Sequence, residues 1–156
     1  MKKNIFIILT ILLITSGCGF KIVNQSKLIN YSISEIKTTG DKRINYKLKN
    51  KLSSSFKNNK NIKVNLFLNT KKNKKSKEKN IQNKITKYEI TIIVKAELKD
   101  INSNNLRNLT ITESGDFLVA NQHSQTLENE KKLISLLTDK LVGKIIQRLS
   151  NNINDI

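Results

Sequence analysis

The sequence contains no proline, no tryptophan, one cysteine and one histidine among its 156 residues. A single cysteine excludes an intrachain disulfide and any cysteine-based metal cage, and a single histidine excludes a zinc site built on paired histidines. The lack of proline, together with only five glycines, argues against a collagen-like or a Gly/Pro-rich disordered chain. The length suits one globular domain of ordinary size.

Arginine and aromatic residues are also scarce, although the chain is strongly basic. The net charge of +17 comes from 26 lysines and only three arginines, and aromatic residues make up 5% of the sequence. Proteins that bind nucleic acids usually use arginine for bidentate contacts and aromatic rings for stacking. Lysine, asparagine and isoleucine fill 71 positions and are all encoded by A/T-rich codons, so codon bias accounts for much of the lysine excess. The composition therefore does not favour a nucleic-acid partner.

The first 17 residues have the three zones of a secretory signal peptide. Lys2 and Lys3 are positively charged, residues 5–14 (IFIILTILLI) form an apolar stretch, and residues 15–17 are small. Ten helical residues at about 1.5 Å each cover roughly half of a ~30 Å hydrocarbon core. A signal peptide that is removed is therefore favoured over a membrane-spanning helix.

The segment ITSGC, which ends at Cys18, resembles the bacterial lipobox, where lipoprotein signal peptidase cuts just before a diacylated cysteine. Thr15 stands where the lipobox usually has leucine. The resemblance implies that Cys18 becomes the first residue of the mature chain and carries a covalent diacylglycerol and an N-acyl chain, a stable anchor. Gly19 in place of aspartate implies sorting to the outer membrane. The alternative is an ordinary secretory signal with an incidental Cys18. The expected organisation is a signal peptide (1–17), an acylated cysteine and tether (18–27) and one domain (28–156).

Alternation of apolar and polar residues predicts four strands, over residues 28–37, 62–69, 84–99 and 106–119. The clearest is 84–99, whose expected buried face consists of Tyr88, Ile90, Ile92, Val94, Ala96 and Leu98. In the first strand, Ile29, Tyr31 and Ile33 are expected on one face, opposite Ser32 and Ser34. In the last strand, Gly115 is expected to form a bulge.

A run of lysines separates the second and third predicted strands. Residues 71–79 (KKNKKSKEK) hold six lysines in nine positions. Because these charges repel one another, we expect an exposed loop or a ragged hairpin tip there rather than a packed strand.

Apolar residues spaced by four predict two amphipathic helices. The first covers residues 42–57, with Asp41 as its N-cap and an apolar stripe of Ile44, Leu48, Leu52 and Phe56. The second covers 126–151, with Thr126 as its N-cap, Glu128 and Glu130 in its first turn, and a broad apolar face that includes Leu133, Leu137, Leu141, Ile145 and Leu149. The expected fold is α+β, in the order β-α-β-β-β-α. A four-stranded, largely antiparallel sheet carries both amphipathic helices on its apolar face.

The sequence shows no arrangement of residues that is typical of a catalytic site. His123 lies in the polar segment NQHSQ, away from any Ser-His-Asp or Cys-His arrangement. Glu113 and Asp116 are three residues apart, which places them on opposite faces of a strand. There is no glycine-rich phosphate loop and no metal-ligand spacing. We therefore expect no enzymatic activity and no cofactor other than the lipid on Cys18.

Several segments together resemble one family. These are GCGF at the cysteine, INYKLKNKLSSSF, TKYEITIIVKAELKD, LTITESGDF and the long final helix. In this order they resemble the LptE family of lipopolysaccharide-assembly lipoproteins, over essentially the whole mature chain. The resemblance implies a four-stranded sheet with two helices that plugs the LptD β-barrel and helps deliver lipopolysaccharide to the outer leaflet. It also implies a location on the periplasmic face of the outer membrane, with the anchor in the inner leaflet. No residue matches the family firmly enough to take over a ligand role.

Lipopolysaccharide carries phosphates and sugar acids, which lysine side chains attract as point charges. The candidate anion-binding residues are the lysines on either side of the predicted hairpin tip: Lys71, Lys72, Lys74, Lys75, Lys77, Lys79, Lys84 and Lys87. Each of them could equally be a solvated surface side chain. Two other functions remain open: a different outer-membrane-assembly lipoprotein, which would not bind LptD, or a soluble polyanion-binding module, which requires an unmodified Cys18.

Overall fold

The computed structural model describes residues 31–56, 62–101 and 106–151. The predicted signal peptide, Cys18, the tether and Ile29 of the first predicted strand lie outside these residues. The elements are β1 (Tyr31–Gly40), α2 (Lys42–Ser55), β2 (Ile62–Lys79), β3 (Ile85–Asp100), β4 (Leu106–Leu118) and α3 (His123–Asn151). The predicted order β-α-β-β-β-α is confirmed.

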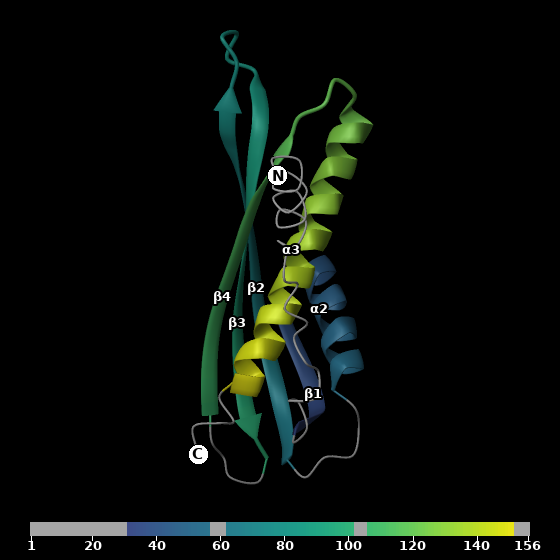
Figure 1. The fold of residues 1–156 in the computed structure, drawn as a ribbon, viewed down its shortest axis with the longest axis vertical. Helices are drawn as coiled ribbons and strands as arrows, with labels where there is room; N and C mark the ends of the chain where they lie inside the picture. Colours follow the sequence, from purple (N-terminus) through teal and green to yellow (C-terminus); the bar gives the residue numbers. More distant parts are fainter. Residues whose placement is uncertain (1–30, 57–61, 102–105, 152–156) are drawn as a thin grey trace, which may run out of the picture.

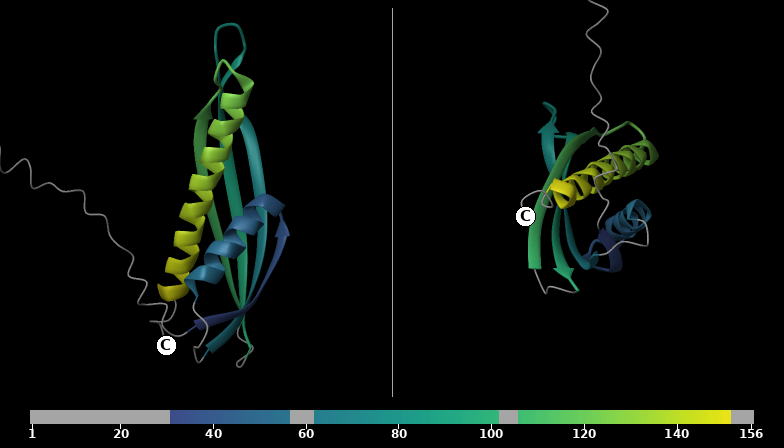
Figure 2. Two further views of the ribbon diagram at one scale, coloured as in Figure 1. Left: turned by 90° about the vertical axis from the view of Figure 1, so that its right-hand side faces the viewer. Right: turned by 60° about the horizontal axis from the view of Figure 1, so that its bottom comes forward.

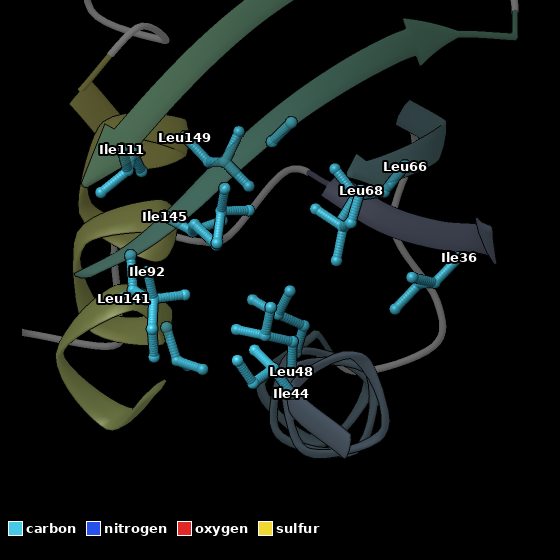
Figure 3. Close-up of a cluster of buried hydrophobic side chains, with 14 of the residues drawn as sticks. Ile36, Ile44, Leu48, Leu66, Leu68, Ile92, Ile111, Leu141, Ile145 and Leu149 are labelled. Atoms are coloured by element: carbon cyan, nitrogen blue, oxygen red, sulfur yellow. The ribbon is translucent and has the colours of Figure 1, made fainter. Parts of the chain in front are cut away.

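The four strands form one sheet in the order β1-β2-β3-β4 (Figure 1). The β1–β2 pair is parallel, and the other two pairs are antiparallel. Both helices cover the same face of the sheet (Figure 2), as predicted, and the other face is open. The core lies between the helices and the covered face, where side chains of all six elements meet (Figure 3): Ile36, Ile44, Leu48, Leu66, Leu68, Ile92, Ile111, Leu141, Ile145 and Leu149.

The turn from β1 into α2 is held by a buried polar network. Asp41 caps α2 as predicted, because its carboxylate accepts hydrogen bonds from the N–H groups of Arg43 and Ile44 at 3.0 and 3.1 Å. The N–H of Asp41 donates to the carbonyl of Thr70 at 3.2 Å. The Thr70 hydroxyl donates to the side-chain oxygen of Asn45 at 2.8 Å. Helix and sheet are thereby joined at one point.

The backbone of Gly40, at the end of β1, lies very close to the backbone of Thr70 in β2. Gly40 has φ +96°, and a Cβ there would lie 1.9 Å from the Thr70 carbonyl oxygen. Only glycine therefore fits between β1 and α2. The predicted stripe of α2 is confirmed, since Ile44, Leu48, Leu52 and Phe56 are all buried.

The predicted start of the last helix is wrong. α3 begins at His123, three residues before Thr126, and no acidic residue lies in its first turn. The Thr126 hydroxyl is engaged elsewhere, because it accepts a hydrogen bond from the N–H of Ala120 at 2.9 Å. Glu128 and Glu130 therefore lie inside α3, past the first turn whose dipole they were expected to complement. The predicted apolar face of α3 is confirmed, with Leu137, Leu141, Ile145 and Leu149 buried and Leu133 partly buried.

Two details of the sheet also differ from prediction. The pairing of β1 with β2 shifts between Ile33 and Glu35, so that Ile33 before the bulge and Ile36 after it both pack against the core, and Ser32, predicted on the opposite face, is also buried. Gly115 is not a bulge, because it pairs with Ile90 in unbroken register. It instead makes room for α3, since a Cβ at 115 would lie 2.9 Å from Leu133 Cδ1. The predicted buried face of β3 is confirmed, with Ile90, Ile92, Val94, Ala96 and Leu98 buried and Tyr88 partly buried.

The lysine run at 71–79 is a strand and not a loop. β2 continues to Lys79 and pairs with β3 as far as Ile85, whereas β1 ends opposite Thr70. Beyond Thr70, β2, β3 and β4 therefore continue as three strands as far as the pair of Lys87 with Leu118, and only the tip of the β2–β3 hairpin extends past β4 (Figure 1). We call β2 and β3 beyond Thr70, together with their turn, the ribbon. The turn of this ribbon is closed by Asn80, whose side-chain oxygen accepts from the N–H groups of Gln82 and Lys84 at 3.0 and 2.9 Å.

Candidate anion-binding surface

The ribbon carries all eight candidate lysines, but the two faces of the ribbon separate them. Lys72 and Lys74 lie on the face that α2 and α3 cover, where they meet Asp41 and Glu130. Lys75 and Lys77 lie on the open face with carboxylates of β3 and β4. The predicted cluster is therefore not one continuous patch.

Lys74 fastens the ribbon to α3. Its Nζ lies 2.6 Å from Glu130 Oε2, and 4.5 and 5.1 Å from the ring centroids of Tyr88 and Phe117. The two rings stack on each other at 5.6 Å. A cation over aromatic faces and beside a carboxylate is stabilised by both. This lysine is a structural clamp rather than a free anion-binding group.

The open-face lysines are also paired with carboxylates. Lys75 Nζ lies 2.8 Å from Glu89 Oε2, and Lys77 lies between Glu89 and Asp116. The hydrogen bond to the Asp116 carboxylate raises the pKa of the Lys77 ammonium above its ordinary value. These lysines offer little net positive charge to a ligand.

Three candidate lysines keep their charge available. Within the part of the chain that the structure describes, Lys71, Lys79 and Lys84 form no ion pair, whereas Lys87 pairs with Glu78 at 2.6 Å. Lys79 and Lys84 flank the turn of the ribbon, at which Ile81 is fully exposed. The tip therefore presents two ammonium groups around one apolar side chain.

A groove between the starts of α2 and α3 adds cations that the sequence analysis missed. It encloses about 190 Å³ and is lined by apolar Ile44, Leu127 and Ile134, by Arg43, Lys47, Lys72 and Lys131, and by Asp41 and Glu130. Among the described residues, Arg43, Lys47 and Lys131 have no ion-pair partner. A groove lined by both apolar and cationic side chains suits an anionic amphiphile. The spacing of four between Arg43 and Lys47 was the available sequence signal, since it places both on one side of α2.

Two other carboxylates, Glu113 and Asp116, lie on opposite faces of the sheet. Glu113 lies on the covered face of the sheet and pairs with Lys144, while Asp116 lies on the open face, so the predicted separation is confirmed. Over residues 31–56, 62–101 and 106–151, no three His, Cys, Asp or Glu side chains lie close enough to hold a metal ion. Within the same ranges no helix has the length and apolarity needed to cross a membrane.

The fold is shared with several bacterial proteins of very different sequence. It matches an uncharacterized lipoprotein B from Nitrosomonas europaea, with TM-score 0.64 and 14% identity over 88% of this chain and 94% of that one. A minor lipoprotein from Acinetobacter baumannii matches with TM-score 0.57 and 17% identity, over 80% and 95% of the two chains. The rare lipoprotein B from Shewanella oneidensis matches with TM-score 0.54 and 13% identity, over 77% and 97%.

No family model matches the sequence, and no curated protein matches it. At 13–17% identity, the likeness to the three solved structures concerns the fold. It extends over more than nine-tenths of each of these proteins. The chain therefore has the fold of three bacterial proteins that are described as lipoproteins.

Proposed function

We propose that this chain is an outer-membrane lipoprotein of the LptE type. Anchored through acylated Cys18 on the periplasmic side, it occupies the lumen of an LptD β-barrel and helps deliver lipopolysaccharide to the outer leaflet. It acts by binding and not by catalysis.

One observation carries this proposal. The four-stranded sheet with two helices, which the resemblance to the LptE family implied, is found in the structure and agrees with the fold of the three lipoproteins. The signal-like residues 1–17 and Cys18 stand directly before this domain. Fold and leader thus support the same class of protein from independent parts of the chain.

The open face of the sheet supports a role inside another protein. Its exposed side chains include Lys37, Asn69, Lys95, Asn108 and Thr112, which can hydrogen-bond with a polar barrel lumen. A hollow of about 320 Å³ lies on this face, and Lys37 stands 5.7 Å from the ring centroid of Phe67 at its border. We infer that this face contacts the barrel wall.

The cationic groove and the tip of the ribbon support an anionic amphiphile as the ligand. The groove combines apolar side chains with three cations that have no ion-pair partner among the described residues, and the ribbon adds Lys71, Lys79 and Lys84. The phosphates of lipopolysaccharide match the cations, and its acyl chains match the apolar side chains of the groove. We expect the paired lysines of the ribbon to contribute little.

Acylation and partner can be tested together in a Gram-negative host. The tagged full chain should incorporate labelled palmitate, and Cys18→Ser should not. Gly19→Asp is the matched control, because it keeps the acylated cysteine and should alter only the sorting between membranes. LptD should copurify from detergent-extracted outer membranes with the parent chain.

The outcomes separate the three functions. Palmitate labelling with a different barrel as partner would favour another outer-membrane-assembly lipoprotein. Absence of labelling, together with binding to heparin, would favour a soluble polyanion-binding module and would refute the proposal.

Lipopolysaccharide affinity can be tested with variants that each remove three cations. Arg43→Ala/Lys47→Ala/Lys131→Ala removes the unpaired charges of the groove, and we expect affinity to fall at least about tenfold, because each charge-assisted contact contributes appreciably. The matched control, built from the exposed lysines outside the groove, is Lys42→Ala/Lys49→Ala/Lys140→Ala.

A second pair of variants separates the free lysines of the ribbon from the paired ones. Lys71→Ala/Lys79→Ala/Lys84→Ala should weaken binding more than Lys75→Ala/Lys77→Ala/Lys87→Ala, whose three lysines are paired with carboxylates and lie outside the groove. Equal losses in all four triple variants would mean that only net charge matters, and the site assignment would be wrong.

A further inference from the structure

Gly143 is an exposed glycine in the interior of α3. Glycine destabilises a helix relative to alanine, because it loses more conformational freedom when the chain folds. At Gly40 and Gly115, an added Cβ would lie 1.9 and 2.9 Å from its nearest neighbour, so the chain itself requires glycine there. A Cβ at Gly143 would meet nothing within 4 Å. No contact among the described residues therefore explains this glycine, and the space that it leaves is on the outside of the helix.

The same side of α3 carries an exposed leucine. The buried side of the helix is formed by Leu137, Leu141 and Ile145. At about 3.6 residues per turn, Gly143 lies almost opposite this buried side. Leu136 precedes Gly143 by about two turns, so both residues lie on one line along the helix, and Leu136 is 52% exposed. An apolar side chain and a gap are therefore neighbours on the outer side of α3.

The charges of α2 are arranged unfavourably for an isolated helix. α2 contains five basic residues and no acidic one, with Lys42 and Arg43 in its first turn and no basic residue in its last turn. Because the helix dipole is positive at its start, cations destabilise the helix there. Of the five, only Lys51 forms an ion pair within the described residues. Arg43 and Lys47 line the groove, but Lys42 and Lys49 do not, so a ligand in the groove does not account for these two lysines.

An exposed tyrosine lies between the two lysines that the groove does not use. Tyr46 is 69% exposed, and its spacing of four from Lys42 and three from Lys49 places the three side chains on one side of α2. Tyrosine combines an apolar ring with a hydroxyl group and is enriched in protein interfaces. A tyrosine between two cations suits a partner surface that carries carboxylates.

The outer sides of the two helices belong to one surface. α2 and α3 lie next to each other on the same face of the sheet (Figure 2), and Lys51 of α2 pairs with Asp139 of α3. We use the name helix surface for the exposed residues described above: Lys42, Tyr46, Lys49, Leu136 and Gly143.

We propose that the helix surface docks against an acidic part of the inner wall of the barrel, and that the wall comes closest at Gly143. This inference rests on the proposed function, which supplies the barrel. A chain inside a closed lumen meets the wall on its helix side as well as on its open face. The interior side chains of such a barrel are polar, so carboxylates among them can pair with Lys42 and Lys49. At Gly143 the absence of a side chain lets the wall approach the helix backbone.

Filling the gap at Gly143 tests the contact without weakening the fold. Gly143→Gln should raise the urea midpoint of the purified chain, because glutamine favours a helix over glycine. In cells that also produce a differently tagged parent chain, the variant should copurify about tenfold less LptD, because overfilling a close contact has an effect of this size. Ser124→Gln is the matched control, since it enlarges a small exposed residue at the start of the same helix, and it should compete equally with the parent.

Reversing two charges on α2 tests whether the wall is acidic. In the same competition, Lys42→Glu/Lys49→Glu should copurify at least about tenfold less LptD, because like charges then face each other across the interface. The loss would not reflect unfolding, since a glutamate at position 42 complements the helix dipole. Lys42→Arg/Lys49→Arg keeps both charges and should compete equally with the parent. Equal losses for the two double variants would show that the wall does not recognise charge, and the acidic partner would be wrong.

The outcomes separate this inference from the proposed function. A parent chain that does not copurify LptD refutes both. If the parent copurifies LptD and Gly143→Gln competes equally with it, only the inference is refuted. Equal losses for Gly143→Gln and Ser124→Gln would also overturn it, because the contact would then not be closest at Gly143. If Gly143→Gln retained LptD but lost a different protein, another partner would cover the helix surface, and the assignment to the barrel would be wrong.

Discussion

Replacing Gly40 by alanine should lower the free energy of unfolding by about 3–5 kcal/mol. Gly40 ends β1 with φ +96°, and the new Cβ would lie 1.9 Å from the Thr70 carbonyl oxygen. An alanine held at positive φ costs about 1–3 kcal/mol. Relieving the contact also requires β1 to move away from Thr70.

That movement would break buried hydrogen bonds. The N–H of Asp41 donates to the Thr70 carbonyl at 3.2 Å, and the Thr70 hydroxyl donates to Asn45 at 2.8 Å. A buried polar group that loses its partner costs about 1–3 kcal/mol. The combined loss is a large part of the 5–15 kcal/mol that stabilises a typical domain.

Urea denaturation of the purified protein, followed by circular dichroism, measures the effect as a lower midpoint at unchanged slope. Gly143→Ala is the matched control, because Gly143 lies inside α3 and its added Cβ would meet nothing within 4 Å. It should stabilise the protein by about 0.5–1 kcal/mol, since alanine favours the helix. If Gly40→Ala were as stable as the parent, the proposed close contact between β1 and Thr70 would be wrong.

Three further measurements test the packing and the ion pairs. Leu141→Ala should cost about 2–5 kcal/mol of unfolding free energy, because this side chain is fully buried, whereas Leu136→Ala, at 52% exposure, should change the midpoint little. A double-mutant cycle with Lys74→Met and Glu130→Gln should give a coupling energy of about 0.5–1 kcal/mol, as for a partly exposed pair, and a value near zero would contradict the clamp between ribbon and α3. NMR titration should show that Lys77 deprotonates above its ordinary pKa of 10.5. The stabilisation it provides is then complete below pH 10.5 and is lost as the pH rises through the raised value; a pKa below 10.5 would contradict its pairing.

The element order could be predicted because local patterns determine it. The stripe from Ile44 to Phe56, the capping position of Asp41 and the alternation in 84–99 each depend on residues close together in the chain. One-sided strands and helices then have to bury their apolar faces against each other. The parallel placement of β1 beside β2, with α2 between them in sequence, follows from the same requirement.

The lysine run could not be read correctly because its partners are distant in the sequence. Lys74 pairs with Glu130, 56 residues away, and Lys77 with Asp116, 39 residues away. These carboxylates offset the repulsion that predicted a loop, and β3 supplies the backbone partner for a strand. Long-range charge compensation therefore explains why the run is a strand rather than the predicted loop, and why several of its lysines are paired rather than free.

The bulge in β1 and the start of α3 were missed for different reasons. The bulge between Ile33 and Glu35 contains no glycine or proline, so the sequence carries no turn signal there. Thr126 has the side chain of an N-cap, but it bonds to Ala120 in the preceding segment, and the helix extends past it to His123. Both depend on tertiary contacts that a local pattern does not contain.

The continuity of β2 has a mechanical consequence. Its 18 residues at about 3.3 Å each make one rod of nearly 60 Å, about twice the thickness of a bilayer's hydrocarbon core. Hydrogen bonds to β3 along almost its whole length oppose bending within the sheet. The register with β3 shifts only between Ser76 and Lys79, beside the tip, so a push at Lys75 is transmitted to the opposite end beside β1 as a displacement of this whole length of β2.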